Sequence, residues 1–303
     1  MKKENSIFLI IARRSFLQVI HNTFLVAFYV LLVAIKNFYL YRFNNRIDKK
    51  SFYRSRNNMR WKCTCAYDGT RFSGWQSQAN HQAVQDVLEE RLCAIFKKFI
   101  RIHGSSRTDA GVHAHGQVFH FDADWPWGPE RLKLAINAQL EHDIRILTVE
   151  EVSDRFHARF SVKKKTYCYH LLLKPADPFQ YPYVWDISPR NFKIGYLQET
   201  LPLFVGTHDF RGFAGKTTLN ENTLKTIYRA ELHSTEEGID LTFTGSGFLY
   251  RMVRILVGSL VLRAYGKIDT TFIQQRLQLK NLSLPVVTAP ARGLFLESIV
   301  YDS

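Results

Sequence analysis

The sequence predicts an α+β protein with two similar halves, each containing a mixed or antiparallel sheet flanked by helices. Three observations support this class. The chain has 303 residues, which is enough for one large domain or two ordinary ones. Its apolar fraction of 46% and charged fraction of 22% are typical of a globular protein. Segments with alternating apolar residues are interleaved with segments in which apolar residues recur at helical spacing.

The first half is predicted to extend from residue 59 to residue 173. Asn80 is expected to cap its first helix, because a short polar side chain can accept a hydrogen bond from a first-turn amide. Pro129 is expected to open the second helix, since proline is tolerated in a first turn. The expected elements are a strand at 61–67, the Asn80-capped helix with an apolar face over 84–92, a strand at 117–122, a helix at 129–140, and strands at 144–152 and 166–173.

The second half is predicted to extend from residue 174 to residue 303. Its first part, 174–189, is rich in proline and is the best candidate for a linker. The expected elements after it are a helix at 191–205, strands at 226–233 and 239–244, a long helix at 248–265, a short helix at 270–279 and a closing strand at 295–301.

Residues 1–58 form a basic and hydrophobic extension. They hold eleven lysines and arginines against Glu4 and Asp48, so they carry +9 of the net charge of +14. The apolar run 24–35 is too short alone to cross a bilayer. A membrane anchor, an organelle-targeting segment and a misassigned start with the true start at Met59 all remain open, and we favour the last. Membrane contact is expected only if this segment is real.

The four cysteines are few and scattered along the chain. Cys63 and Cys65 alternate along an expected strand and would therefore share a face. This usage is unlike a disulfide framework and favours buried thiols in a reducing compartment. We expect a cytoplasmic protein.

The most informative segment is 104–115, which reads GSSRTDAGVHAH. Asp109 follows Arg107 by two residues, and Gly104 and Gly111 flank them. Glycines allow the backbone to turn, and a nearby cation favours an ionised carboxylate. We expect this loop to present Asp109 to a ligand with Arg107 as its companion.

From about Met59 to Tyr301 the chain resembles the tRNA pseudouridine synthase A family in its bacterial form. The resemblance rests on many motifs in the order of the family, together with a glycine at 258. They are YDGT at 67–70, FSGWQ at 72–76, SRTDAGVH at 106–113, QVFHF at 117–121, FHARFS at 156–161, TYCY at 166–169, GTHDF at 206–210, FLYRMVR at 248–254 and ARGLFL at 291–296.

The resemblance implies an isomerase with the pseudouridine synthase fold that converts uridine to pseudouridine in the tRNA anticodon stem-loop, at about positions 38–40 of the tRNA. It also implies a homodimer that needs no cofactor and no metal. Asp109 falls on the catalytic aspartate and Arg107 on the arginine beside it. Tyr167 falls on the tyrosine that stacks against the target uracil. Arg254 matches an arginine near the active site, and its spacing from Arg251 would place both on one side of a helix.

One position departs from the family pattern. Lys225 stands where the family usually has the arginine of an Arg-Thr-Ile triplet. Lysine keeps the charge but loses the bidentate fork of arginine. A phosphate contact would survive this change. The run 163–165 and Arg159 are further candidates for contact with an RNA backbone.

Two other functions compete with the isomerase. A metal-dependent phosphodiesterase is suggested by clustered potential ligands, namely His103, Asp109, His113, His115, His120 and Asp122. Against it, no second acid–histidine cluster with ligand spacing follows. The other alternative is an RNA-binding protein that has lost catalysis, and the presence of Asp109, Arg107 and Tyr167 argues against it.

Overall fold

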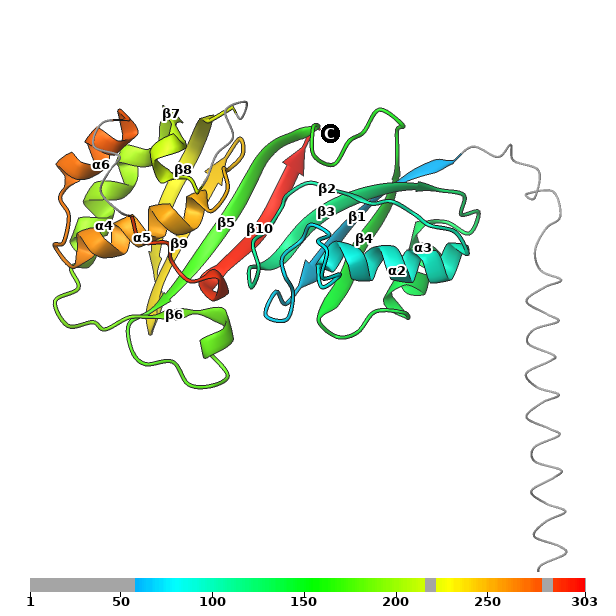
Figure 1. Ribbon diagram of the computed structural model, residues 1–303, viewed down its shortest axis with the longest axis horizontal. Coiled ribbons are helices and arrows are strands. Elements are labelled where there is room, and N and C mark those ends of the chain that lie inside the picture. Colours follow the sequence, from blue (N-terminus) through cyan, green and yellow to red (C-terminus); the bar gives the residue numbers. More distant parts are fainter. Residues whose placement is uncertain (1–57, 216–221, 280–285, 303) are drawn as a thin grey trace, which may run out of the picture. The chain divides into compact units, whose positions relative to one another are not determined.

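Figure 1 shows the computed structural model of the chain, which describes residues 58–215, 222–279 and 286–302. The expectations for the extension 1–58 therefore fall outside the described residues, apart from Asn58. The strands are β1 (Met59–Tyr67), β2 (His103–Gly104), β3 (His113–Ala123), β4 (Ile144–Val152), β5 (Val162–Leu172), β6 (Trp185–Asp186), β7 (Gly206–Asp209), β8 (Leu224–Ser234), β9 (Gly238–Gly245) and β10 (Leu294–Tyr301). The α-helices are α2 (Val84–Phe96), α3 (Pro129–Asn137), α4 (Ile194–Thr200), α5 (Met252–Ala264) and α6 (Thr270–Leu277).

The described strands form one continuous mixed sheet. Eight of them follow the order β4-β1-β3-β10-β5-β9-β8-β7, while β2 pairs with β3 and β6 with β5. The pairs β10–β3 and β5–β6 are parallel and the others are antiparallel. Figure 1 shows α2 and α5 in front of this sheet. The predicted α+β class, with a mixed sheet and flanking helices, is confirmed.

The last strand of the chain lies in the middle of the sheet. Strand β10 pairs with β3 on one side and with β5 on the other. In this register Phe295 is opposite both His113 and Cys168, and Leu296 is opposite Tyr167. The beginning of β3 and the middle of β5 are thus brought together across β10. The boundary between halves at residues 173 and 174 stays a prediction.

Alternation along the strands separates the two faces of the sheet. On β5, Tyr167, Tyr169 and Leu171 are buried, and they pack in one apolar cluster with Leu256 and Leu260 of α5. Helix α5 is apolar almost all round and most of its residues are buried, as expected for a helix enclosed by protein. On β1, Cys63 and Cys65 are both fully buried, and their alternation places them on the same face.

Helix α2 begins at a different residue from the predicted cap. Its N-cap is Ala83, and Asn80 lies outside the helix. The amides of Val84 and Gln85 donate to the carbonyls of Gly74 and Trp75. A neighbouring backbone segment therefore satisfies first-turn donors that a capping side chain would otherwise accept.

Helix α5 also begins later than predicted, at Met252 and not at residue 248. Arg251 is the N-cap residue and has a left-handed backbone, with φ of 59°. The carbonyl of Tyr250 accepts a hydrogen bond from the amide of Gly215, a residue outside the helix. Arg251 and Arg254 consequently do not share a helix face, and that expectation was wrong.

The predicted helix 191–205 is divided into α4 and a 3-10 turn, Leu201–Phe204, which contains Pro202. Proline cannot donate a main-chain hydrogen bond and so interrupts the α-helical pattern. In the ranges 58–215, 222–279 and 286–302, no helix combines the length and the apolar content that a bilayer span requires.

Candidate active site

The loop that carries Asp109 connects β2 to β3 and is held by hydrogen bonds before and after this residue. The amide of Trp75 donates to the carbonyl of Thr108 at 3.1 Å, and the Thr108 hydroxyl lies 2.8 Å from the Tyr67 hydroxyl. The amide of Val112 donates to the Asp109 carbonyl at 3.1 Å and closes a turn. These contacts fix the main chain on both sides of the Asp109 side chain.

Gln117 holds the beginning of the same loop. Its side chain is fully buried and accepts from the amide of Ser106 while donating to the Ser106 carbonyl, at 3.2 and 2.8 Å. Lys165 adds a third contact, with its Nζ donating to the Ser105 carbonyl at 2.7 Å. Burial, with smaller contributions from the charges of Arg159 and Lys225, lowers the pKa of Lys165 to about 8.

Gly74 permits the close approach of the FSGWQ segment to this loop. Its φ is +97°, and a Cβ atom there would lie 2.5 Å from the Thr108 carbonyl oxygen. Such a contact is shorter than any ordinary van der Waals approach, and the conformation itself disfavours other residues. The motif at 72–76 therefore supports the loop that carries Asp109.

The carboxylate of Asp109 pairs with Arg254, not with Arg107. Arg254 Nη1 donates to Asp109 Oδ2 at 2.7 Å, and both side chains are 14% exposed. Arg254 Nε donates to the carbonyl of Ala289, whose amide in turn donates to the Arg254 carbonyl. The guanidinium is thus oriented by a second, independent contact. The expectation that Arg107 pairs with Asp109 was wrong.

Arg107 instead is exposed to solvent. Its side chain forms no hydrogen bond or ion pair with another residue in the described ranges. It lines a pocket that is also lined by Asp109, Tyr167 and Arg254, with a cavity volume of about 50 Å³. The structure therefore brings all four predicted site residues to one pocket. Thr108 and Arg251 also line it, together with apolar residues, namely Val112, Phe248, Leu249, Met252, Val253 and Leu294.

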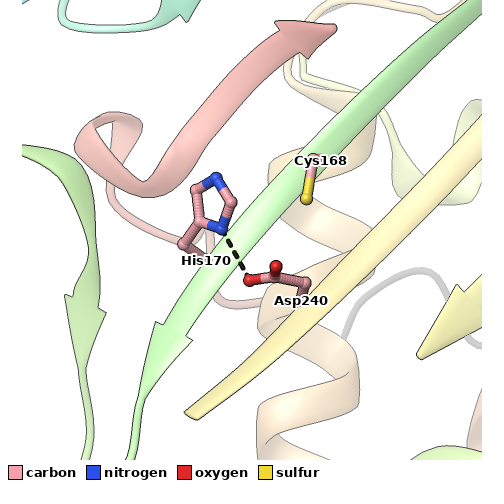
Figure 2. Close-up of side chains that lie close together, drawn as sticks. All are labelled: Cys168, His170 and Asp240. Atoms are coloured by element: carbon pink, nitrogen blue, oxygen red, sulfur yellow. Dashed lines mark hydrogen bonds and ion pairs between the residues drawn. The ribbon is translucent and has the colours of Figure 1, made fainter. Parts of the chain in front are cut away.

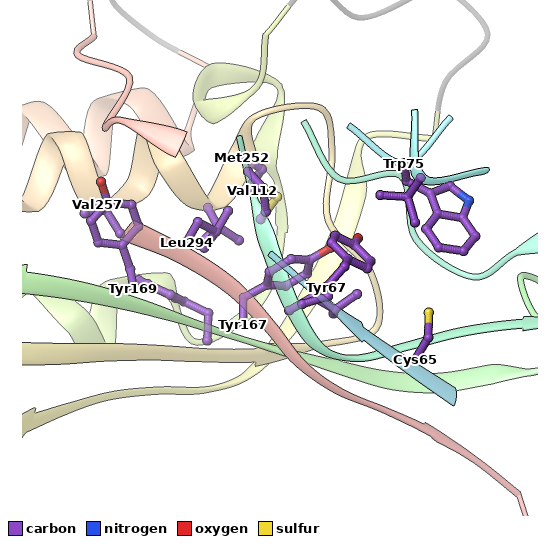
Figure 3. Packing of buried hydrophobic residues seen from close by; sticks show 14 of the residues in the cluster. Cys65, Tyr67, Trp75, Val112, Tyr167, Tyr169, Met252, Val257 and Leu294 are labelled. Carbon is purple, nitrogen blue, oxygen red and sulfur yellow. The ribbon is translucent and has the colours of Figure 1, made fainter. Parts of the chain in front are cut away.

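Tyr167 forms the floor of this pocket from β5. Figure 3 shows its ring near Val112, Met252 and Leu294. The Phe248 ring meets it edge-on, with centroids 5.2 Å apart and planes at 85°. Burial raises the pKa of Tyr167 to about 12, and the charge of Asp109 contributes in the same direction. The phenol is therefore protonated at neutral pH.

Two of the histidines that suggested a metal site, His113 and His120, form hydrogen bonds with the main chain. His113 Nδ1 accepts from the amide of Gly69, and its Nε2 lies 3.0 Å from the carbonyl of Pro182. His120 Nδ1 accepts from the amide of Ala158, and burial lowers its pKa to about 4. None of the six suggested ligands belongs to a metal-binding cluster within the described ranges.

One group in the described part of the chain has donors that could hold a metal ion, and Figure 2 shows it. Cys168 and His170 of β5 face Asp240 of β9, and His170 Nδ1 lies 2.6 Å from Asp240 Oδ1. These residues alternate with Tyr167 and Tyr169, so they lie on the opposite face of the sheet from the pocket. Burial raises the pKa of Cys168 to about 12, so its sulfur is a thiol at neutral pH.

Comparison with known proteins identifies the family. The family described as tRNA pseudouridine synthase matches residues 64–161 and 201–302. The chain belongs to the tRNA pseudouridine synthase family. It is 43% identical to tRNA pseudouridine synthase A 1 of Protochlamydia amoebophila over 248 residues, which are 80% of this chain and 96% of the relative. It is 42% identical to tRNA pseudouridine synthase A of Anoxybacillus flavithermus and 40% identical to that of Bacillus subtilis, covering 80% and 81% of this chain and 99% and 100% of the relatives.

Membership in the tRNA pseudouridine synthase family makes the protein an isomerase that acts on tRNA. Sequence reasoning named Asp109, Tyr167, Arg107 and Arg254 but missed the residues that hold them. Gln117 was not recognised as the anchor of the loop, although it lies in the QVFHF motif. The pairing of Arg254 with Asp109 gave no local signal, because the two residues come from distant segments.

Proposed function

We propose that the protein converts uridine to pseudouridine in the anticodon stem-loop of tRNAs, at about positions 38–40, with Asp109 as the nucleophile and without a cofactor. The observation that carries this proposal is the Asp109 carboxylate, held by Arg254 at 2.7 Å in a pocket whose floor is Tyr167. A fixed carboxylate next to an aromatic surface suits attack on a pyrimidine nucleoside.

The reaction breaks the bond between the ribose anomeric carbon and N1 of uracil and forms a bond from that carbon to C5. Asp109 attacks either the anomeric carbon or the base, and it leaves unchanged in both routes. The proton displaced from C5 is lost and N1 acquires one, so the product is an isomer of the substrate. The fixed Arg254 guanidinium keeps the carboxylate aimed at one place before the reaction begins.

Access to the uridine requires that it leave the base stack. The Asp109 side chain is only 14% exposed, which favours a target base that has left its helix over a paired base. Arg107 is free to occupy the space that the flipped base leaves. Tyr167 supplies a flat surface for the uracil, and its protonated hydroxyl is a hydrogen-bond donor until a reaction step removes that proton.

The remaining parts of the proposal rest on the family resemblance. We propose a homodimer in the cytoplasm, where the tRNA substrate is processed, and activity without a metal. The net charge of +14 favours a polyanionic partner.

The proposal is tested by mapping pseudouridine at nucleotide resolution in total tRNA after incubation with the purified enzyme. The tRNA must come from cells that lack the gene. We expect new pseudouridine in the anticodon stem-loop near positions 38–40. Modification confined to another arm of the tRNA would contradict the proposed target, and absence of new pseudouridine in any tRNA would contradict the proposed reaction.

A further inference from the structure

A second hollow adjoins the active-site pocket, and Arg107 lines both. This neighbouring hollow has a cavity volume of about 360 Å³ and is lined mainly by Gln76, Arg101, His103, Arg159 and Phe160. No aspartate or glutamate is among the residues that line it. Of the residues that the structure describes, Arg107 is the one that lines both hollows.

The charge of this hollow is positive and partly uncompensated. Arg101 pairs with Glu89, with Nη1 3.1 and 3.2 Å from its two carboxylate oxygens. The exposed side chains of Arg107 and Arg159 have no acidic partner among the described residues. The charge of Arg159 also contributes to the low pKa of the neighbouring Lys165. Two guanidinium groups are therefore available to an anion here, and guanidinium forks suit phosphate oxygens.

Phe160 gives the same hollow an aromatic surface. Its side chain is 77% exposed, and its ring lies 4.3 Å from the His157 ring between centroids. Arg159 lies near the Phe160 ring, 6.0 Å from its centroid. An exposed phenylalanine beside unpaired arginines is a surface on which a nucleobase can stack, and such stacking accepts any base.

Gln76 supplies an oriented amide. Its Nε2 donates to Gln85 Oε1 at 2.6 Å, and Gln85 Nε2 donates to Glu89 Oε1 at 2.8 Å. This chain of contacts fixes the Gln76 side chain, while its carbonyl oxygen accepts no hydrogen bond from a residue in the described ranges. A held amide with a free acceptor can bind the edge of an unstacked base.

We propose that this hollow binds a second unstacked nucleotide of the same RNA strand, next to the target uridine. Its base stacks on Phe160, its edge meets Gln76, and its phosphate lies at Arg159. Lys163 takes no part, because it pairs with Asp302. This inference rests on the proposed function, since it assumes that the target uridine occupies the pocket of Asp109 and Tyr167. It implies that the enzyme opens two neighbouring nucleotides and not one.

The test measures binding separately from chemistry. The tRNA dissociation constant is measured for Phe160→Ala, Phe160→Tyr and Phe179→Ala, each in an Asp109→Asn protein that does not turn over. Phe179 is 87% exposed and lines neither hollow, so it is a matched control. We expect Phe160→Ala to weaken binding by roughly 5- to 150-fold, the usual range for one stacked base. Phe160→Tyr and Phe179→Ala should stay within about twofold of the parent.

Transcripts with one abasic nucleotide locate the stacked base. Removal of the base at one position beside the target uridine should weaken binding to the Phe160-containing protein. The same abasic transcript should cause no further loss of binding with Phe160→Ala. Equal losses in both proteins at every abasic position, or a Phe160→Ala effect no larger than that of Phe179→Ala, would overturn the inference. If Phe160→Ala fails to fold, the abasic series with the parent protein decides alone. In that case, unchanged binding at every abasic position beside the target uridine would contradict the proposal. Pseudouridine formation by the wild type is measured separately, so that a failure of the proposed function can be distinguished from a failure of this inference.

Discussion

The carboxylate of Asp109 and the guanidinium of Arg254 lie 2.7 Å apart, although 145 residues separate them in the chain. Asp109 comes from the loop between β2 and β3, and Arg254 comes from the first turn of α5. Strand β10 makes this meeting possible, because it pairs with β3 on one side and β5 on the other. The site is therefore assembled by the sheet and not by one segment.

Arg254→Lys should lower activity, because lysine has one nitrogen in place of the two, Nη1 and Nε, that bind Asp109 and the Ala289 carbonyl. A lost charge-assisted hydrogen bond costs about 1.5–3 kcal/mol, which predicts a fall in kcat/KM of roughly 10- to 150-fold. Arg263→Lys is the control, since Arg263 lies in the same helix but pairs with Glu199 and does not line the pocket. Single-turnover rates with tRNA measure both variants. Equal effects of the two substitutions would contradict the assigned pairing.

Gly74→Ala should lower both stability and activity, since the added Cβ would meet the Thr108 carbonyl at 2.5 Å. Gly128→Ala is a matched control. Gly128 also has a positive φ, of +80°, but a Cβ there meets nothing within 4 Å. An alanine at position 128 would be strained by this φ, which should cost about 1–3 kcal/mol of folding free energy and leave kcat unchanged. Thermal melting and kcat are compared, and a Gly74→Ala protein with wild-type kcat would show that the loop tolerates displacement.

Tyr167→Phe should bind tRNA as the wild type does, because the ring that faces the pocket is kept. Tyr167→Leu should bind more weakly by roughly 5- to 150-fold, since it removes the stacking surface. Equilibrium binding in the Asp109→Asn background checks both. The activity of Tyr167→Phe in an otherwise wild-type enzyme then tests the hydroxyl, because full activity would exclude proton transfer by Tyr167.

Lys165→Met should change how stability depends on pH. The folded-state pKa of about 8 lies below that of an unfolded lysine, so between pH 8 and pH 10 the unfolded chain binds more protons at this residue. Wild-type stability should therefore rise through this window relative to Lys165→Met, by at most about 3 kcal/mol. Urea unfolding at several pH values gives the difference. Parallel curves for the two proteins would contradict the assigned burial of the ammonium.

Local patterns were sufficient to predict most elements of the fold. Strand β4 has the predicted bounds, and the alternation that places Cys63 and Cys65 on one face is confirmed by their burial. The errors at the starts of α2 and α5 fall where a distant backbone segment replaces a local signal. Gly74 and Trp75 accept the first-turn amides of α2 in place of Asn80, and Gly215 binds the Tyr250 carbonyl before α5.

The site was predicted as a set of residues but not as a set of contacts. Asp109 and Arg107 are neighbours in sequence, and their proximity made them the obvious ion pair. In the structure Arg254 takes that place, because β10 brings α5 and the β2–β3 loop together. A contact between such distant segments can be predicted only when the fold that brings them together is known. The roles proposed for these residues stay predictions until variants are assayed.

The most direct test of the nucleophile is tritium release from tRNA labelled at C5 of uridine, because forming the new carbon–carbon bond removes that hydrogen. Wild type is compared with Asp109→Asn, which keeps the size of the side chain but removes its charge. We predict release with the wild type and essentially none with Asp109→Asn at matched folding and tRNA binding. Equal release by the two proteins would contradict the central role of Asp109.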